Sequence, residues 1–587
     1  MTTAGNAALQ PELSSTAAAG TISTGYKTNR LSPRQVVFEA SPAAKQLPNI
    51  IMHMTDDQGY YHVGFNSERT DKPSRDVKGV TPHATELAMK DGIVLTRHYV
   101  HWHCSPSRRA FLTGRLPIHM GEALSPEDED HIDLRWKTIG HKLESAGYAS
   151  YWFGKGHTGF KSMRHLPIHA GFSAGSVGFL GANMYHGSTS VRWQGDDWFI
   201  PHNLSARETH LYESRLSSDI KYSTRHWSLE ALRALRKHDT RKPVFMFMAW
   251  QEPHRPYEAP PGWNAKTQSC DGMETDHSSV SIAKRSDACS MFTMLGFMDE
   301  QMAQMTAVLK ERGMWANTLM VIASDNGGVD AGVNYPLRGE KHTNFEGGIR
   351  GAAAVTGGLV PEQLRGTINS KVFSIVDWYP TFCHLAGVDP SDDPPVAPSE
   401  ALRGSSGYDS GIYGQSSYPG IDGVNIWPHL SSPDTKEHSS DDAHEELVVT
   451  SEVLVAGRYK LVTAMPDPDL MKEKHVELGW RSPDGSWEEA DAAKWSCSTF
   501  EDRRVFRPCL FDIEEDEREK VDLSSKFPQL TMKLWGRLNE TLRTRYATRS
   551  PPELLGTCDT SCAAKHFAQP AAKKHLRHPV CGVPGCS

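Results

Sequence analysis

The sequence predicts an α/β protein: a mostly parallel sheet flanked by helices, then a smaller C-terminal α+β domain that contains a short antiparallel sheet. Two observations lead to this fold class. From residue 48 onward, short apolar runs that end in polar residues alternate with helical patterns, as they do when helices connect the strands of a parallel sheet. Nearer the C-terminus, two apolar runs flank Ala456 and Gly457, which predicts a β-hairpin instead of another crossover.

The large domain begins with a buried strand at 49–55, which carries Asp56 and Asp57 at its carboxyl end. A helix follows from Thr81 to Asp91, because Thr81 suits the N-cap position and Pro82 suits the first helical position. Further strands are expected at 92–96, 148–153, 242–250 and 318–324, and further helices at 136–146 and 291–312. Because parallel strands end at a common edge, we expect the polar residues that follow them to share that edge.

The small domain is predicted from a hairpin with strands at 446–455 and 458–463, a strand at 509–513 and a final helix at 528–546. Together with composition, these elements divide the whole chain into five expected parts. The expected parts are a disordered N-terminal extension at 1–47, the large domain at 48–389, an irregular Pro-, Ser- and Gly-rich connection at 390–445, the small domain at 446–548 and a Cys-rich tail at 549–587.

Charge and hydrophobicity exclude two classes of partner. The 63 Lys and Arg residues against 71 Asp and Glu residues give a net charge of −8, so nucleic acid is not expected as a partner. No run approaches 18 apolar residues, so no transmembrane segment is expected.

The ten cysteines point to an oxidising compartment, although no secretory signal is readable at the start of the chain. Cys270 with Cys289 and Cys497 with Cys509 are spaced for short-loop disulfides. The four cysteines of the tail favour disulfides, with zinc binding as the alternative; they are Cys558, Cys562, Cys581 and Cys586. Asn203 and Asn539 are N-glycosylation acceptors if the chain enters the secretory route.

Oxygen-bearing residues follow two of the predicted strands. Asp56 and Asp57 follow the first strand, and Asp325 and Asn326 follow the strand at 318–324. Together they would form an oxygen-rich cage for a hard cation such as Ca²⁺ or Mg²⁺. Either pair alone is equally typical of a solvated turn.

The segment from Cys104 to Arg115 places a cysteine ahead of a predicted helix, whose N-terminus favours an anion. With Arg108 and Arg109 nearby, this pattern suggests an activated nucleophile beside an oxyanion pocket, and a buried structural cysteine is the alternative. Four further residues are candidates for catalysis, because they follow apolar strands or lie in polar loops: Lys155, His157, His254 and Lys341. Taken singly, each is more typical of a hydrogen-bonded interior side chain or of a surface side chain.

These motifs together resemble the type I sulfatases. The resemblance rests first on the string Cys-Ser-Pro-Ser-Arg at 104–108, which Leu-Thr-Gly continues at 112–114, and it covers about residues 48–545. The other matching strings are at 56–59, 154–157, 253–254, 324–328, 336–341 and 346–350. Cys509 to Asp512, Glu519 and Asp522 are similar to the C-terminal domain of the arylsulfatase B-like branch, which includes N-acetylgalactosamine-4-sulfatase.

The resemblance implies an alkaline phosphatase-like fold, with 48–389 as the catalytic domain, and hydrolysis of sulfate esters. It implies that a formylglycine-generating enzyme oxidises Cys104 to formylglycine (3-oxoalanine), whose hydrate attacks the sulfur of the ester. One Ca²⁺ ion would be held by Asp56, Asp57, Asp325, Asn326 and the oxygen at position 104. Arg108 would hold the hydrate and His157 would act as a base. Lys155 would orient the sulfate, and His254 and Lys341 would bind sulfate oxygens and protonate the leaving alcohol.

The family analogy favours a sulfated sugar over an aryl sulfate as substrate, and a lysosomal or extracellular location. Gly156 and Thr158 depart from the family, which has bulkier Trp and Leu at these positions. Two rival functions are a phosphomonoester or phosphonate monoester hydrolase of the same superfamily and a non-catalytic carbohydrate-binding protein that keeps the fold.

Overall fold

The computed structural model describes residues 46–73, 75–122, 131–159, 163–179, 181, 185, 198–199, 222–260, 282–392, 419–432, 443–465, 476–488 and 508–546. Several predictions concern residues outside these ranges: the N-terminal extension up to residue 45, most of the 390–445 connection, the Cys-rich tail, and Asn203. The predicted division into domains stays a prediction.

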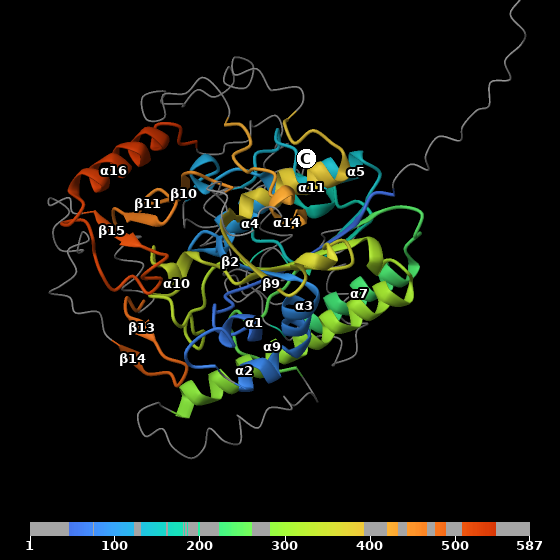
Figure 1. The fold of residues 1–587 in the computed structure, drawn as a ribbon. Helices are drawn as coiled ribbons and strands as arrows, with labels where there is room; N and C mark the ends of the chain where they lie inside the picture. The colour runs from blue at the N-terminus through green and yellow to red at the C-terminus, as the bar shows by residue number, and fades with distance from the viewer. Residues whose placement is uncertain are drawn as a thin grey trace, which may run out of the picture. The chain divides into compact units, whose positions relative to one another are not determined.

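A nine-stranded, mostly parallel sheet confirms the expected α/β class (Figure 1). Its order is β5-β4-β3-β6-β1-β7-β8-β2-β9. The strands are β1 (Asn49–Thr55), β2 (Ile93–Tyr99), β3 (Ala149–Lys155), β4 (Gly175–Phe179), β5 (Trp198–Phe199), β6 (Val244–Ala249), β7 (Thr318–Ser324), β8 (Ala353–Thr356) and β9 (Thr367–Ser374). Only β5 and β8 run antiparallel to their neighbours. Consequently the central strands β3, β6, β1 and β7 end at one edge.

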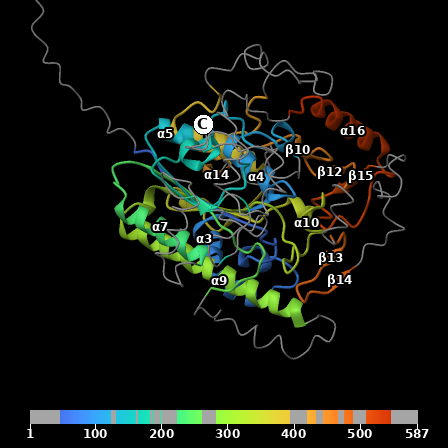
Figure 2. The ribbon, with the colours of Figure 1, turned by 180° about the vertical axis from the view of Figure 1, so that it is seen from behind.

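Both faces of this sheet are buried because alternate side chains of each strand enter opposite cores. In β6, Phe245 and Phe247 pack on one face, while Met246 and Met248 pack on the other. The first face is covered by α4 (Cys104–Thr113), α5 (Ile139–Ser145) and α11 (Trp378–Ala386). The second is covered by α7 (Ser223–Lys237) and α9 (Ile282–Glu311), which lie together on the opposite side in both ribbon views (Figures 1 and 2).

The remaining described helices are short, apart from α3 and α16. They are α1 (Gly64–Ser67), α2 (Arg75–Val80), α3 (Pro82–Asp91), α10 (Glu346–Ile349), α14 (Trp427–Ser431) and α16 (Pro528–Leu542). None of the helices in the described ranges combines the length and the apolar character needed to cross a bilayer.

The expected antiparallel sheet of the C-terminal region is also confirmed. Its four strands are β10 (Leu447–Thr450), β11 (Val453–Ala456), β12 (Tyr459–Val462) and β15 (Cys509–Asp512), in that order. One face packs on α16, and the other packs on Tyr99, Phe345 and Ile349 of the large sheet region. A separate two-stranded sheet pairs β13 (Trp480–Arg481) with β14 (Trp487–Glu488).

Several predicted boundaries were wrong; the final helix, for example, ends at Leu542 and not at residue 546. The expected strand at 446–455 is two strands, because the chain turns at Ser451, where the Thr450 hydroxyl accepts a hydrogen bond from the backbone of Glu452. The helix expected from 136 begins at Ile139, because Thr138 and His141 form a capping box there. The helix expected from 291 begins already at Ile282.

Candidate active site

The carboxyl ends of β1 and β7 bring the four predicted oxygen-bearing residues together. The two strands pair in parallel up to Thr55 and Ser324, and the Asp325 backbone N–H donates to the Thr55 carbonyl at 3.1 Å. Asn326 Nδ2 donates to Asp57 Oδ1 at 2.8 Å, and the Asp57 backbone N–H donates to Asp325 Oδ1 at 3.3 Å. All four residues are at most 5% exposed.

The loop after β7 is fixed by close backbone packing against α10. A Cβ at Gly327 would lie 1.7 Å from the Gly347 carbonyl oxygen, so only glycine fits there. The Gly327 N–H donates to the Gly348 carbonyl at 3.0 Å. This contact fixes the direction in which Asp325 and Asn326 leave the sheet.

Helix α4 places Cys104 and Arg108 against this loop. Cys104 is the first residue of α4, not a residue ahead of it as expected, and His103 occupies the N-cap position. One turn later, Arg108 donates to Asp325 Oδ2 from Nε at 2.8 Å and approaches it with Nη2 at 2.7 Å. Cys104 and Arg108 are 1% and 0% exposed. Arg109 instead donates to the Gly121 carbonyl, so it is not part of this cluster of contacts.

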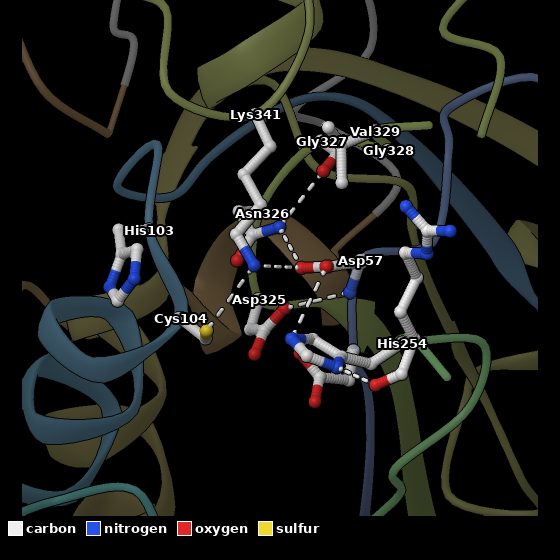
Figure 3. A network of polar contacts seen from close by, with 12 residues as sticks. Asp57, His103, Cys104, His254, Asp325, Asn326, Gly327, Gly328, Val329 and Lys341 are labelled. Atoms are coloured by element: carbon white, nitrogen blue, oxygen red, sulfur yellow. Dashed lines mark hydrogen bonds and ion pairs between the residues drawn. The ribbon is translucent and has the colours of Figure 1, made fainter. Parts of the chain in front are cut away.

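Three more predicted side chains converge on the same carboxylates, as Figure 3 shows for two of them. Lys341 Nζ lies 2.6 Å from Asp57 Oδ1 and 3.6 Å from Cys104 Sγ. His254 Nε2 lies 3.6 Å from Asp57 Oδ2. Lys155, the last residue of β3, lies 2.5 Å from Asp56 Oδ2.

His157 lies beside His103. Its ring centroid is 5.7 Å from that of His103, the residue before Cys104. His157 and Asp57 have φ angles of 52° and 57°. Side chains other than glycine rarely adopt this left-handed conformation, and such strain clusters at functional sites.

Burial and mutual attraction shift the pKa values of the charged groups. Burial alone would raise the pKa of Asp56, but Lys155, His254 and Arg108 outweigh it and hold the pKa below its ordinary value. Burial lowers the pKa of His254, although Asp56 and Asp57 oppose this. For Lys341, burial lowers the pKa, but the attractions of Asp57, Cys104 and Asp56 together outweigh it and raise the pKa. Both lysines of the site therefore stay protonated at neutral pH.

Several donor atoms suit a cation. Ligand atoms of Asp56, Asp57 and Cys104 all lie within 4.8 Å of one another. The oxygens Asp56 Oδ1 and Asn326 Oδ1 are buried and accept no hydrogen bond from any residue that the structure describes. Buried acceptors without a donor are costly unless something else satisfies them, and carboxylate and amide oxygens are the ligands that Ca²⁺ prefers. The donor set therefore fits a hard divalent cation.

The sequence interpretation missed two histidines beside this site. The ring centroid of His342, which follows Lys341, lies 5.6 Å from that of His103, which precedes Cys104. Burial lowers the pKa of His103, and the nearby Lys341 adds to the effect, so its ring is neutral. Their positions next to two predicted site residues were the only sequence signal.

The cysteine predictions are tested only in part. Cys104 and Cys383 carry free thiols. Cys289 and Cys509 are each disulfide-bonded, but Cys270 and Cys497 lie outside the described residues. The two predicted pairings therefore stay predictions.

Known proteins resemble the chain in sequence. The family model "Sulfatase" matches residues 48–388. Arylsulfatase J of Mus musculus is 28% identical over 521 residues, which cover 88% of this chain and 79% of the relative. N-acetylgalactosamine-6-sulfatase of Sus scrofa is 26% identical over 386 residues, which cover 60% of this chain and 64% of the relative. Arylsulfatase A of Homo sapiens is 26% identical over 380 residues, which cover 61% of this chain and 68% of the relative.

Solved structures share the fold. Ps i-CgsB, in complex with k-i-k-neocarrahexaose, matches with a TM-score of 0.55 and 21% identity, over 87% of this chain and 96% of that one. The PsFucS1 sulfatase from Pseudoalteromonas sp. matches with a TM-score of 0.54 and 18% identity, over 86% and 92%. Because the family model spans more than half of the 587 residues, this chain belongs to the sulfatase family.

Proposed function

We propose that this protein hydrolyses sulfate esters through a formylglycine derived from Cys104, with the help of one Ca²⁺ ion. The observation that carries the proposal is the convergence of Lys341, Asp57 and the Cys104 thiol within 3.6 Å contacts (Figure 3). A formylglycine at position 104 would supply a hydrated aldehyde, whose hydroxyl group would be the nucleophile. The unmodified thiol cannot form this hydrate. The cation would polarise a sulfate oxygen and lower the pKa of the attacking hydroxyl.

The chain's own residues would bind and orient the ester. Asp56, Asp57, Asp325 and Asn326 would hold the cation through their buried oxygens. The Lys155 and Lys341 ammonium groups would attract the sulfate oxygens, because both remain protonated inside the protein.

Three side chains would transfer protons: His157, His254 and Lys341. His254 and Lys341 would donate a proton to the departing alcohol, and both already contact Asp57. His157 would accept the proton that must leave position 104 when sulfate is expelled. Arg108, held by Asp325, would keep the residue-104 oxygen in place.

The substrate that we propose is a sulfated carbohydrate, with aryl sulfates as artificial substrates. Support comes from the names of the relatives, which include an N-acetylgalactosamine-6-sulfatase, and from the k-i-k-neocarrahexaose in the complex of a structure with the same fold. Membership of the arylsulfatase B-like branch stays a prediction. The disulfides at Cys289 and Cys509 support an oxidising, secretory compartment.

Peptide mass and activity test the proposal together. The protein is produced with a formylglycine-generating enzyme, and the tryptic peptide from His98 to Arg108 is weighed. Conversion of Cys104 lowers its mass by about 18 Da. The converted protein should hydrolyse 4-methylumbelliferyl sulfate, and chelation of calcium should abolish this activity reversibly.

A Cys104→Ala variant serves as the matched control, since it folds with the same cage but cannot be converted. It should lack sulfatase activity entirely. A converted protein that hydrolyses 4-methylumbelliferyl phosphate but not the sulfate would favour the phosphoesterase alternative. A chain that is never converted and binds sulfated sugars without cleaving them would favour the non-catalytic alternative.

A further inference from the structure

A cavity lies on the α5 side of the large sheet, and none of its lining residues belongs to the candidate active site. Its volume is about 450 Å³, which lies within the range of small-molecule sites. We call it the α5 cavity; its lining includes Trp136, Lys137, Thr138, Trp152, Thr158 and Arg164. Nothing in the sulfate-ester chemistry above uses any of these side chains.

The inner wall of the α5 cavity is apolar and aromatic. Trp152 of β3 and Leu112 of α4 line it and are 2% and 0% exposed. Ile132 and Trp136 line it from the segment before α5 and are 9% and 4% exposed. A ligand with an apolar ring face would replace water on this wall, which favours binding.

The edge of the cavity is built by a fixed hydrogen-bond arrangement. The Thr138 hydroxyl donates to the Ala170 carbonyl at 2.5 Å. His141 Nε2 donates to the His169 carbonyl at 2.9 Å, while its Nδ1 accepts from the Thr138 backbone N–H. Because these bonds join the start of α5 to the segment at 167–170, the two walls keep their separation.

Among the described lining residues, two exposed cationic side chains mark the edge of the cavity, which we call its mouth. Lys137 and Arg164 both line the cavity and are exposed. No carboxylate in the described residues forms an ion pair with the Lys137 ammonium. The one acidic lining residue, Asp133, is already paired with Arg135, whose Nε lies 2.8 Å from Asp133 Oδ1.

We propose that the α5 cavity binds an anionic sugar: a single pyranose ring that carries a carboxylate or a sulfate. The ring would rest on the aromatic wall, and its anionic group would meet Lys137 and Arg164 at the mouth. Thr158 lines the cavity with a small side chain.

An occupant of this cavity would contact the segment that carries two candidate catalytic side chains. Trp152 Nε1 donates to the Lys155 carbonyl at 3.1 Å, and Thr158 directly follows His157. The cavity lies behind this segment, so binding there does not depend on conversion of Cys104. A failure of the proposed function would leave this proposal intact, and the reverse also holds.

Titration of the purified protein with sodium glucuronate, by isothermal calorimetry, tests the proposal. Glucose supplies the ring without the charge, and sodium sulfate supplies the charge without the ring. The expected result is saturable binding of glucuronate, with glucose and sulfate at least about tenfold weaker.

Two variants assign the binding to the α5 cavity. Lys137→Gln with Arg164→Gln should weaken glucuronate binding about tenfold or more, whereas Lys533→Gln with Arg236→Gln, an equal charge change at exposed residues of α16 and α7, should not. Ala170→Leu should abolish binding by filling the cavity, with folding checked by thermal melting.

Three outcomes would overturn the proposal. The first is binding of glucuronate that does not saturate, and the second is a double variant at the mouth that binds glucuronate as tightly as the unchanged protein. Loss of binding in a His254→Ala variant, but not in the mouth variant, would place the sugar in the active site instead.

Discussion

At the scale of single residues, Lys341 has the most demanding position in the site. Its side chain is 5% exposed, and its ammonium nitrogen lies 2.6 Å from Asp57 Oδ1 and 3.6 Å from the Cys104 sulfur. The attractions of Asp57, Cys104 and Asp56 together raise its pKa and keep it protonated despite its burial. A fixed positive charge beside the nucleophile can stabilise negative charge on a transferring group without any rearrangement.

Replacing Lys341 by Met should therefore lower kcat/KM for an aryl sulfate by about a hundredfold or more, since that is the usual cost of removing one such electrostatic group. Steady-state kinetics of the converted protein would measure the loss. Lys533→Met, on the exposed face of α16, is the matched control. Activity within about threefold of the unchanged protein would remove Lys341 from the mechanism.

His98 shows how burial of a single side chain makes stability depend on pH. Burial lowers its pKa from the ordinary value of 6.5 to about 4, although Asp377 opposes the shift. Its Nε2 accepts a hydrogen bond from Trp378 Nε1 at 3.1 Å. Between pH 6.5 and about 4, the unfolded chain binds a proton that the folded protein excludes, so stability is full above pH 6.5 and falls as the pH is lowered.

The change His98→Gln should flatten this acid loss, because glutamine can keep the contact with Trp378 but cannot titrate. Between pH 7 and pH 4.5, the free energy of unfolding should fall by roughly 2 kcal/mol less than in the unchanged protein. Urea titrations at several pH values would show this. His384→Gln, at an exposed position of α11, should leave the slope unchanged. An identical slope in H98Q would mean that other groups cause the acid loss.

At the scale of elements, α3 depends on a side chain from another helix. Its N-cap residue Thr81 makes no side-chain capping bond. Instead Asp299 of α9 accepts hydrogen bonds from the backbone N–H groups of His83, at 2.9 Å, and Ala84, at 2.8 Å. The sequence predicted Thr81 as the cap, but the acceptor is supplied by a residue 215 positions away from Ala84.

The substitution Asp299→Ala should destabilise the protein by about 1–3 kcal/mol, because two buried N–H groups of α3 lose their acceptor. Chemical denaturation monitored by fluorescence would measure the change. Gln304→Ala, an exposed change on the same helix, should cost less than about 0.5 kcal/mol. If D299A were equally mild, water or another group would have to satisfy α3.

Some strands could be predicted from the sequence and others could not, and the difference has physical reasons. The strands at 49–55 and 318–324 were predicted with their true bounds, because strands buried on both faces are continuous apolar runs. No strand was predicted at β8 or β9. The first has only four residues, and the second, at the edge of the sheet, alternates half-buried and exposed residues over its first half.

The predicted site residues lie in five elements, β1, α4, β3, β6 and β7, or in the loops that follow them, and motif strings alone identified them. His103 and His342 escaped because no motif includes them, and only the fold brings their rings to 5.6 Å. The α5 cavity could not be predicted either, since its lining comes from segments between residues 112 and 170. Spacing along the chain does not indicate that these segments enclose a volume.

At the scale of the whole molecule, a buried charge cluster joins the C-terminal sheet to the region of the large sheet. Lys460 of β12 lies 3.0 Å from Glu346 of α10 and 2.8 Å from Glu519, and all three side chains have no solvent exposure. The Glu346 backbone N–H also donates to Glu519 at 2.7 Å. Because α10 fixes the Asp325 loop, this cluster connects the C-terminal sheet to the site.

Lys460→Met should cost about 3–5 kcal/mol, because it leaves two buried carboxylates without their shared cation. Thermal and urea unfolding would measure the loss, and adding Glu519→Gln should recover part of it. The control is Arg458→Gln, which breaks a pair whose Arg side chain is 40% exposed and should cost less than about 1 kcal/mol. A K460M protein as stable as R458Q would show that the cluster contributes specificity and not stability.

The burial of Cys104 limits when its proposed oxidation can occur. With 1% of its surface exposed, the residue cannot enter another enzyme's active site once the sheet has formed, so the proposed oxidation must come before folding. Lys341 leaves the ribosome 237 residues after Cys104. At about 5–20 residues per second, synthesis gives the modifying enzyme roughly 10–50 s. The active fraction of newly made protein would then be decided by a kinetic competition, in which faster folding yields fewer competent molecules.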